Sequence, residues 1–195
     1  MFDEEQAQFV CDFLECLTCS SGVPLRLMDW QRNMITEFYG QLIEDEDDPA
    51  GSYLRRYQYL YLEIAKKNGK SEIAAGLGVY HLFADGEING EVYVVAADRD
   101  NAGIVFAAAK YMVEQSPALK KRSRIVDSVK TIYDETSGSR LKQCPVAYSK
   151  HGYKPSCVIF DELHAQPSRD LWDVMTFGSG DARRQPVDRA DDRRR

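Results

Sequence analysis

No hydrophobic run in this sequence approaches the roughly 20 residues that a helix needs to cross a bilayer. The first residues, Met1-Phe2-Asp3-Glu4-Glu5, are acidic, whereas a secretory signal begins with positive charge. The five cysteines are odd in number, which favours reduced thiols in a cytosolic setting over a disulfide framework. A formal net charge of −6 argues against a protein that coats nucleic acid over its whole surface. These shortages predict an ordinary soluble protein with at most local nucleic-acid contacts.

Histidine is scarce too, and the three that occur (His81, His151 and His164) lie far apart in the sequence. Cys16-Leu17-Thr18-Cys19 is a single CxxC pair, and a zinc site would need two more ligands. We therefore expect these thiols to pack on an amphipathic helix. The chain has 195 residues, of which 44% are hydrophobic and 29% charged, enough for one domain with a substantial core.

The most informative stretch is a β-rich apolar run over residues 59–65 that breaks into Asn68-Gly69-Lys70-Ser71. A strand, a glycine turn and a helix opening with Lys-Ser form a cradle for nucleotide phosphates, because backbone N–H groups point at the anion. Lys70 would reach the β- and γ-phosphates, and the Ser71 hydroxyl would bind Mg²⁺. The usual pattern has a glycine where this chain has Ile64, so a chance Gly-Lys-Ser turn is the alternative.

A second apolar run, over residues 157–160, ends in Asp161-Glu162. This pattern is typical of a buried parallel strand with two carboxylates at its carboxyl end. Asp161 would hold Mg²⁺ opposite Ser71, and Glu162 would polarise the water that attacks the γ-phosphate. Either motif alone could be structural. Together, in this order and spacing, they predict an ATPase.

The order of predicted elements indicates an α/β protein. Helices are expected over residues 3–19, 29–43, 70–83, 100–115 and 168–177. Strands are expected over residues 57–65 and 91–97 and in the run that ends at Asp161, and short strands or hairpins are expected over residues 124–134 and 139–148. Alternating strands and helices with apolar strands predict a mostly parallel sheet with helices on both faces, preceded by N-terminal helices.

Two charge runs stand apart from these motifs. Lys120-Lys121-Arg122-Ser123-Arg124 is a basic cluster that either contacts phosphates or forms a solvated loop. Glu44-Asp45-Glu46-Asp47-Asp48-Pro49 is interpreted as a solvated helix end and loop without chemistry.

With these motifs placed, the chain resembles the ATPase domain of phage large terminase subunits, the motors that package DNA into capsids. The loop Lys66-Lys67-Asn68-Gly69-Lys70-Ser71 is similar to the branch of the family that reads Arg-Lys-Asn-Gly-Lys-Ser, and terminases often lack the first glycine. Leu27-Met28-Asp29-Trp30-Gln31 looks like the family's adenine-recognition motif. Further segments that match are residues 91–106, 151–156, 161–165 and 182–186. The resemblance covers residues 25–187.

The resemblance implies a P-loop NTPase of the ASCE/RecA-like type that uses ATP and Mg²⁺. It implies that Gln31 reads the adenine edge and that Glu162 is catalytic. The implied ATP-binding residues are Gln31, Lys66, Lys67, Asn68, Gly69, Lys70 and Ser71, and the implied metal ligands are Ser71 and Asp161. Lys66 stands where this branch of the family usually has an arginine. A lysine ammonium is a point charge, whereas an arginine guanidinium can form two parallel hydrogen bonds.

The resemblance also implies partners and a setting. These are double-stranded DNA, a portal protein, a small terminase subunit and a homo-oligomeric ring, with no membrane, in the cytoplasm of a bacterial host that carries a phage or prophage. In such rings an arginine reaches the γ-phosphate of a neighbour, and the candidates here are Arg99, Arg122, Arg124 and Arg140.

The C-terminal end departs from the family. Relatives continue into an apolar strand, a Thr-Thr-Ala-Gly coupling motif and a nuclease domain, whereas residues 187–195 are highly charged. One set of codons for Asp191-Asp192-Arg193-Arg194 would encode Thr-Thr-Ala-Gly in a shifted frame, so we expect a frameshifted or truncated gene. A deliberately chosen end point or a natural basic tail is the alternative. The expected organisation is an N-terminal helix and linker over 1–24, an incomplete ATPase domain over 25–187 and a charged, disordered tail over 188–195.

A fragment of this kind should bind nucleotide but show weak or no DNA-stimulated turnover. Three other interpretations stay open. A superfamily 2 helicase would share the glutamine motif and Asp161-Glu162-Leu163-His164, but it would need the glycine at 64 and a second RecA-like half. A non-catalytic assembly piece would bind nucleotide or a partner subunit without hydrolysis. An unproductive pseudogene product would do neither.

Overall fold

Five strands form the central sheet of the computed structural model, which describes residues 1–46, 52–65, 67–96, 99–144, 154–165 and 168–177. The strands of this sheet are β3 (Glu91–Ala96), β4 (Ser123–Val126), β5 (Thr131–Asp134), β6 (Arg140–Gln143) and β7 (Cys157–Asp161). Their order across the sheet is β4-β5-β6-β3-β7. β3 is parallel to both β6 and β7, whereas β4 and β5 add an antiparallel hairpin. The predicted α/β architecture is therefore confirmed, with a parallel centre and an antiparallel wing.

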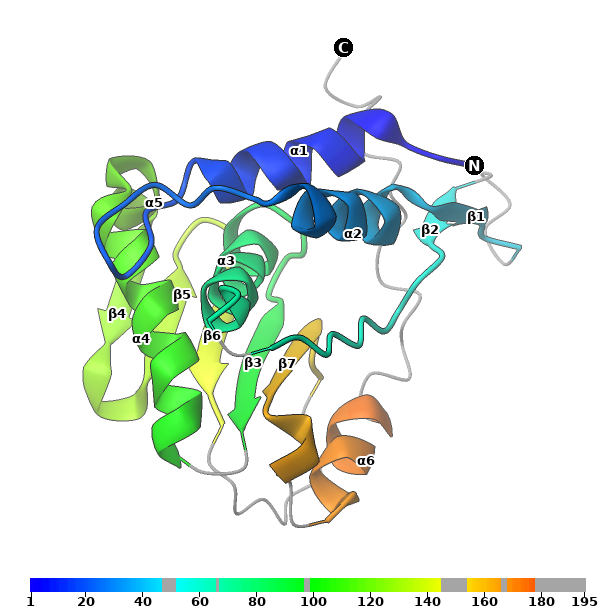
Figure 1. The fold of residues 1–195 in the computed structure, drawn as a ribbon. Coiled ribbons are helices and arrows are strands. Elements are labelled where there is room, and N and C mark those ends of the chain that lie inside the picture. The colour runs from blue at the N-terminus through cyan, green and yellow to red at the C-terminus, as the bar shows by residue number, and fades with distance from the viewer. Residues whose placement is uncertain (47–51, 66, 97–98, 145–153, 166–167, 178–195) are drawn as a thin grey trace.

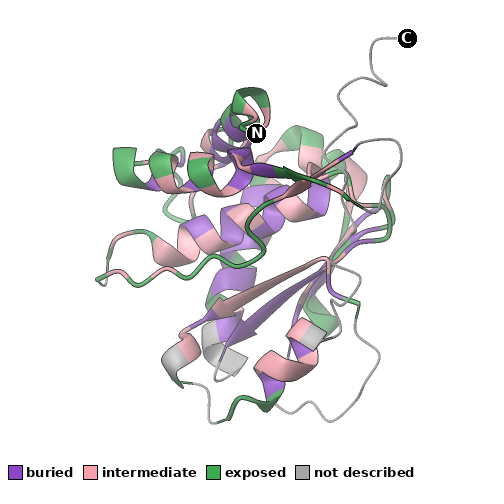
Figure 2. Cartoon of the chain, turned by 90° about the vertical axis from the view of Figure 1, so that its right-hand side faces the viewer, coloured by how far each residue is buried: buried purple, intermediate pink, exposed green. Residues whose placement is uncertain are grey.

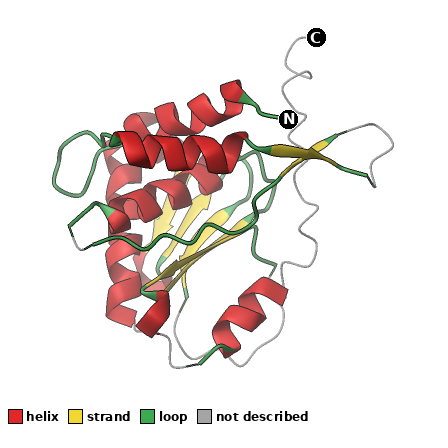
Figure 3. Ribbon diagram, turned by 45° about the vertical axis from the view of Figure 1, so that its right-hand side comes forward, coloured by secondary structure: helices red, strands yellow, loops and turns green. Residues whose placement is uncertain are grey.

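Helices occupy both faces of this sheet (Figure 1). They are α1 (Glu4–Glu15), α2 (Asp29–Gly40), α3 (Lys70–Phe83), α4 (Arg99–Gln115), α5 (Pro117–Arg122) and α6 (Asp170–Phe177), with short 3-10 turns η1 (Asp127–Val129) and η2 (Leu163–Ala165). Figure 3 shows α1 and α2 as an outer layer over α3, with α6 alone across the sheet. Among the described residues, no helix has the length and apolar character that a bilayer crossing needs.

The sequence of β3 accounts for its central place. Val92 and Val94 point into the main core, where they meet α3 and α4, while Tyr93 and Val95 point to the opposite face and pack with α6. A strand buried on both faces reads as a continuous apolar run, as β3 does. Figure 2 shows this burial along the strands and the inner helix α3. The sheet thus supports two apolar clusters, one on each side.

The predicted strand over residues 57–65 is wrong. β2 (Tyr53–Arg55) pairs instead with β1 (Leu42–Glu44) in a separate antiparallel ribbon, and residues 57–65 run on without a ladder partner. Tyr59 and Tyr61 are 61% and 73% exposed, and Tyr59 stacks on Trp172 of α6 at 5.8 Å between ring centroids. A run of apolar residues with high β-propensity favours an extended chain, but a strand also requires a neighbour that supplies hydrogen bonds.

Other boundaries differ by a few residues. The first helix ends at Glu15 instead of residue 19, and the second ends at Gly40 instead of 43. A Cβ at Gly40 would come within 2.5 Å of the Phe2 ring, so glycine lets the N-terminal segment cross here, and Ile43 then pairs with Leu54. The basic run over residues 120–124, for which a solvated loop was one of two interpretations, lies largely in α5, because Pro117 is well suited to the first helical turn.

The remaining predicted elements are recovered where the structure describes them. The helix over 70–83, the strand over 91–97 and the helix over 168–177 correspond to α3, β3 and α6. The predicted turn at Ser137-Gly138 links antiparallel β5 and β6, and Gly138 has a φ of +74° that suits glycine. Residues 145–148, part of an expected strand, and the charged tail over 188–195 lie outside the described residues.

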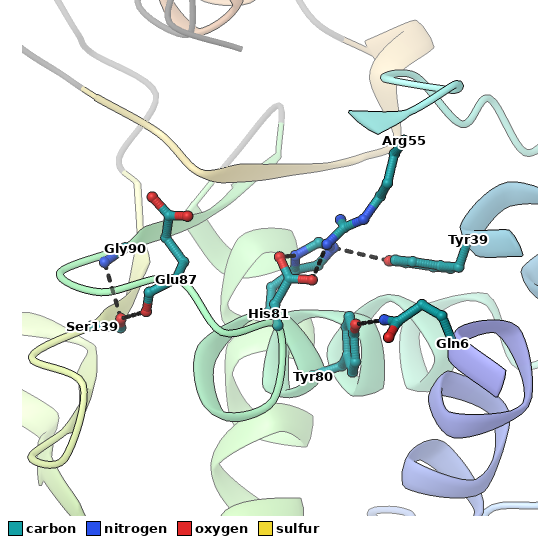
Figure 4. A network of polar contacts seen from close by, with 9 residues as sticks. Gln6, Tyr39, Arg55, Tyr80, His81, Glu87, Gly90 and Ser139 are labelled. Atoms are coloured by element: carbon teal, nitrogen blue, oxygen red, sulfur yellow. Dashed lines mark hydrogen bonds and ion pairs between the residues drawn. The ribbon is translucent and has the colours of Figure 1, made fainter. Parts of the chain in front are cut away.

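A buried polar network ties α2, α3 and β2 together (Figure 4). Tyr39 Oη and His81 Nε2 are 2.9 Å apart, and His81 Nδ1 lies 2.8 Å from Asp85 Oδ2. Arg55 closes the network through an ion pair with Asp85. Nearby, Gln6 Nε2 of α1 donates to Tyr80 Oη at 2.8 Å. The network therefore anchors the carboxyl end of α3 to the ribbon and to the outer helices.

Burial and charge pull in opposite directions within this network. Burial disfavours ionisation of Asp85, but the His81 imidazolium and the Arg55 guanidinium outweigh it and hold the pKa of Asp85 well below its usual range. Burial likewise disfavours the charged form of His81, but Cys157 and Asp85 outweigh it and raise the pKa of His81. The Asp85 contribution is present above the unfolded pKa of about 3.9 and is lost as the pH falls. The His81 contribution is complete below the unfolded pKa of about 6.5 and is lost as the pH rises.

We expect Asp85→Asn to lower the free energy of unfolding by about 3 kcal/mol near pH 6, because it leaves Arg55 buried without its counter-charge. The loss should shrink below about pH 4, where the wild type itself loses this contribution. Urea unfolding of the wild type and the variant between pH 3 and 8 measures this difference in the free energy of unfolding. Asp127→Asn, which removes an exposed pair with Lys110, is the control and should have a much smaller effect at every pH. Equal losses for the two variants would contradict the assignment.

Candidate functional site

The loop before α3 has the backbone geometry of an anion cradle. Gly69 is the N-cap of α3 with a φ of +75°, and Lys67 also has a positive φ, of 69°. The Asn68 side chain donates from Nδ2 to the carbonyl oxygen of Ala65 at 3.0 Å. Because the first N–H groups of a helix have no intrahelical acceptor, this turn presents donors and the positive end of the helix dipole.

Lys70 is the first residue of α3, and it joins this loop to β7. Its Nζ lies 3.1 Å from Asp161 Oδ1 and also contacts Glu162 Oε1. The hydrogen bond to Glu162 raises the pKa of Lys70, partial burial opposes the shift, and Asp161 adds to it. The two motifs therefore lie side by side, although Lys70 and Glu162 are 92 positions apart in the sequence.

The two carboxylates sit in different environments. Asp161 is the last residue of β7 and is buried, whereas Glu162 is half-buried and has a φ of 52°, which is uncommon for a residue with a side chain. The backbone N–H of Glu162 donates to Asp161 Oδ1 at 3.1 Å. This turn directs Glu162 out of the strand line and toward Lys70, and strained backbone of this kind is often found at functional sites.

Gln31 approaches the same loop from α2. Its Nε2 donates to the carbonyl oxygen of Asn68 at 3.1 Å, and its Oε1 accepts from the N–H of Met28 at 2.8 Å. Ser71 is half-buried in the first turn of α3. The predicted residues Gln31, Asn68 and Lys70 thus come together, while Lys66 lies outside the described residues.

Two contacts near the loop were not predicted from the sequence. Glu72, in the first turn of α3, accepts hydrogen bonds from the N–H and hydroxyl of Ser20, in the connection between α1 and α2. Glu15 of α1 accepts from the N–H of Leu27 at 3.1 Å and pairs with Arg32 at 2.7 Å. An acidic residue in the first turn of a helix is a recognisable signal. Its hydrogen-bond partner Ser20, 52 residues earlier, cannot be recognised from the local sequence.

The described arginine candidates lie away from this loop. Arg122 pairs with the buried Asp134, and Arg124 lies 4.2 Å from the centre of the Tyr133 ring, both at the sheet edge opposite β7. Arg140 begins β6 and pairs with Glu91, at the end of the parallel strands opposite Asp161. The side chain of Arg99 is outside the described part. The three described arginines therefore do not contribute to the loop of their own chain.

Asp161 and Glu162 are two carboxylates that follow one another at the end of β7. Among the described residues no group of three or more His, Cys, Asp or Glu side chains could hold a metal. Mg²⁺ often binds through one or two protein oxygens with water and phosphate completing its shell, so this donor set suits a phosphate-bound Mg²⁺ better than a permanent metal centre. The thiols of Cys16 and Cys19 are free.

A family model described as the ATPase domain of the terminase large subunit matches residues 29–189. The chain belongs to this family. Membership in this family favours the terminase interpretation over a superfamily 2 helicase. The matched region includes Gln31, the loop before α3 and the Asp161-Glu162 turn.

A phage HK97 protein agrees with this assignment in sequence and in structure. The large terminase subunit of Enterobacteria phage HK97 is 30% identical over 163 residues, which cover 82% of this chain and 30% of that protein. The crystal structure of the HK97 large terminase matches with a TM-score of 0.74 at 29% identity, covering 93% of this chain and 36% of that one. The Thermus phage P74-26 large terminase ATPase domain gives a TM-score of 0.49 at 18% identity over 58% of this chain and 51% of that one. The terminase chain thus spans about a third of the length of its HK97 relative.

We expect Gly69→Ala to weaken binding of inorganic pyrophosphate by more than about threefold, because alanine disfavours the left-handed backbone that shapes the loop. The nearest atom to a Cβ at Gly69 is Gln31 Nε2 at 3.7 Å, so crowding is not the cause. Gly86→Ala is a matched control, since Gly86 has a φ of +83° and open space around it, away from the loop. Both variants should lose about 1 kcal/mol in urea unfolding. Equal pyrophosphate affinity in the two variants would contradict a role for the loop.

Proposed function

We propose that this chain is the ATP-hydrolysing motor domain of a phage large terminase, with a P-loop NTPase fold, acting in the packaging of DNA. The observation that carries the proposal is the contact of Lys70 Nζ with both Asp161 and Glu162. A cation at the start of a helix, facing two carboxylates at the end of a parallel strand, is an arrangement with which P-loop NTPases carry out phosphoryl transfer. Membership in the terminase family supports the same activity.

The loop over residues 67–71 would hold the phosphates of ATP. The N–H groups in the first turn of α3 have no intrahelical acceptors, and the Lys70 ammonium stays charged beside its carboxylate partners. Lys66 would add a further positive charge to the loop. An arriving γ-phosphate would compete with Glu162 for the Lys70 ammonium, which separates the ion pair and frees the carboxylate.

Ser71 and Asp161 would hold Mg²⁺. A bound Mg²⁺ supplies positive charge that neutralises the phosphoryl oxygens. The hydroxyl of Ser71 and the carboxylate of Asp161 are oxygen donors of the type that this ion prefers. Asp161 is buried at the strand end, so its position is determined by the sheet.

Glu162 would act as the general base. Once separated from Lys70, its carboxylate accepts a proton from the water that attacks the γ-phosphate, and the Lys70 ammonium remains with the phosphate oxygens. Its turn conformation places it beyond the strand end, beside Asp161 without sharing its burial. The two acids therefore have separate roles, one for the metal and one for the proton.

Assembly and partners extend the proposal. In a homo-oligomeric ring with double-stranded DNA, a portal protein and a small terminase subunit, the exposed Arg124 at the β4 edge would be available to a neighbouring copy. Arg122 is a weaker candidate, because it serves the buried Asp134. A non-catalytic assembly piece is the second interpretation, and the Lys70–Glu162 ion pair could also serve as a static link between α3 and β7.

We expect Lys70→Ala to weaken binding of Mg-ATP by about 10- to 100-fold, since a charge-assisted contact to phosphate is lost. Glu162→Gln should keep binding and lower hydrolysis by about 10²- to 10⁴-fold, because an amide accepts no proton. Calorimetry and phosphate release measure the two quantities. Lys110→Ala and Glu114→Gln, both on α4, are matched controls that should leave binding and hydrolysis unchanged. Binding without turnover in the wild type would favour the non-catalytic interpretation, and a folded wild type that does not bind Mg-ATP would refute the proposal.

A further inference from the structure

The side-chain amide of Gln31 bridges two backbone segments. Oε1 accepts the N–H of Met28, just before α2, and Nε2 donates to the carbonyl of Asn68 in the loop before α3. The residue is only 3% exposed. A glutamine that reads a base must present its amide edge to the ligand, whereas here both ends of the amide already hold backbone groups.

The acceptor of this bond is the carbonyl oxygen of the peptide that links Asn68 to Gly69. Asn68 stands between Lys67 and Gly69, which both have a positive φ. In a trans peptide the C=O and the following N–H point in opposite directions. By holding the Asn68 carbonyl toward α2, Gln31 therefore turns the Gly69 N–H away from α2.

Glycine itself does not secure this orientation. Gly69 adopts positive and negative φ with similar ease, so the peptide before it can rotate at little steric cost. The following peptide is held by the helical bond from the Ile73 N–H to the Gly69 carbonyl, at 3.0 Å. The Asn68 side chain secures only the start of the loop, through Ala65. The hydrogen bond from Gln31 Nε2 to the Asn68 carbonyl therefore links α2 to the Asn68–Gly69 peptide and holds that peptide in its orientation.

We propose that Gln31 is a positioning residue that orients the Asn68–Gly69 peptide, and so sets the affinity of the loop for a triphosphate whatever base it carries. The inference rests on the proposed function, because it assigns the loop to phosphates. It differs from adenine recognition in its consequence. Loss of the amide should weaken all triphosphates equally, whereas loss of base recognition should weaken only ATP.

The test compares the wild type, Gln31→Met and Gln31→Glu. Methionine keeps the length of the side chain and removes both hydrogen bonds, while glutamate keeps an acceptor for Met28 and loses the donor to Asn68. We expect the affinities of each variant for Mg-ATP, Mg-GTP and Mg-tripolyphosphate, measured by calorimetry, to fall by a common factor of about tenfold. Gln41→Ala is the control, because Gln41 follows the far end of α2 and its side chain donates to Glu37, away from the loop before α3.

A second measurement needs no ligand. Amide hydrogen exchange of residues 68–71 should become faster in Gln31→Met and stay unchanged in Gln41→Ala, provided that circular dichroism shows both to be folded. A loss confined to ATP, with tripolyphosphate and GTP affinities retained, would overturn the inference and assign Gln31 to the adenine. Unchanged affinities and exchange would overturn it as well. Failure of the wild type to bind Mg-ATP would instead refute the proposed function, so the two failures are distinguishable.

Discussion

The ammonium group of Lys70 is the point on which the candidate site depends, because it connects the start of α3 to the end of β7. One positive and two negative charges meet there, and the positive charge of a metal ion would offset the excess negative charge. Asp161 is buried in the sheet and Glu162 is held by an uncommon turn, so the carboxylates keep their places while the Lys70 side chain can change partner. The ion pairs of Lys70 with Asp161 and Glu162 are thus contacts that an anionic ligand would replace by moving the lysine side chain alone.

The inner helix α3 is held at both ends by polar contacts and along its length by the core. Its carboxyl end carries the buried network of His81 and Asp85, which Arg55 of the ribbon completes. In its first turn Glu72 accepts a hydrogen bond from the N–H of Ser20, and in the preceding loop the Asn68 carbonyl accepts one from Gln31. Between them, residues such as Val79 pack against the sheet and the outer helices. A helix restrained in this way presents its first turn to a ligand in a defined direction, which electrostatic preorganisation requires.

Local patterns predicted most of the elements, and they failed where the outcome depended on a neighbour. The run over residues 57–65 has the apolar, β-rich composition of a strand, yet it pairs with no strand among the described residues, and its Tyr59 packs on Trp172 instead. The helix expected to reach residue 43 stops at Gly40 because Phe2 crosses there. The buried network was also invisible in the sequence, since Arg55 and Asp85 are 30 residues apart and each looks like an ordinary surface charge.

The sequence by itself determined the α/β class, the loop that ends in Lys70-Ser71, the acidic pair Asp161-Glu162 and the terminase family, because these depend on residue type and local spacing. Only the tertiary structure decided that Lys70 meets both acids and that the amide of Gln31 faces the protein backbone. It also decided which apolar runs enter the sheet. Each of these outcomes depends on contacts between segments distant in sequence, and such contacts follow from the packing of the whole domain and not from local propensity.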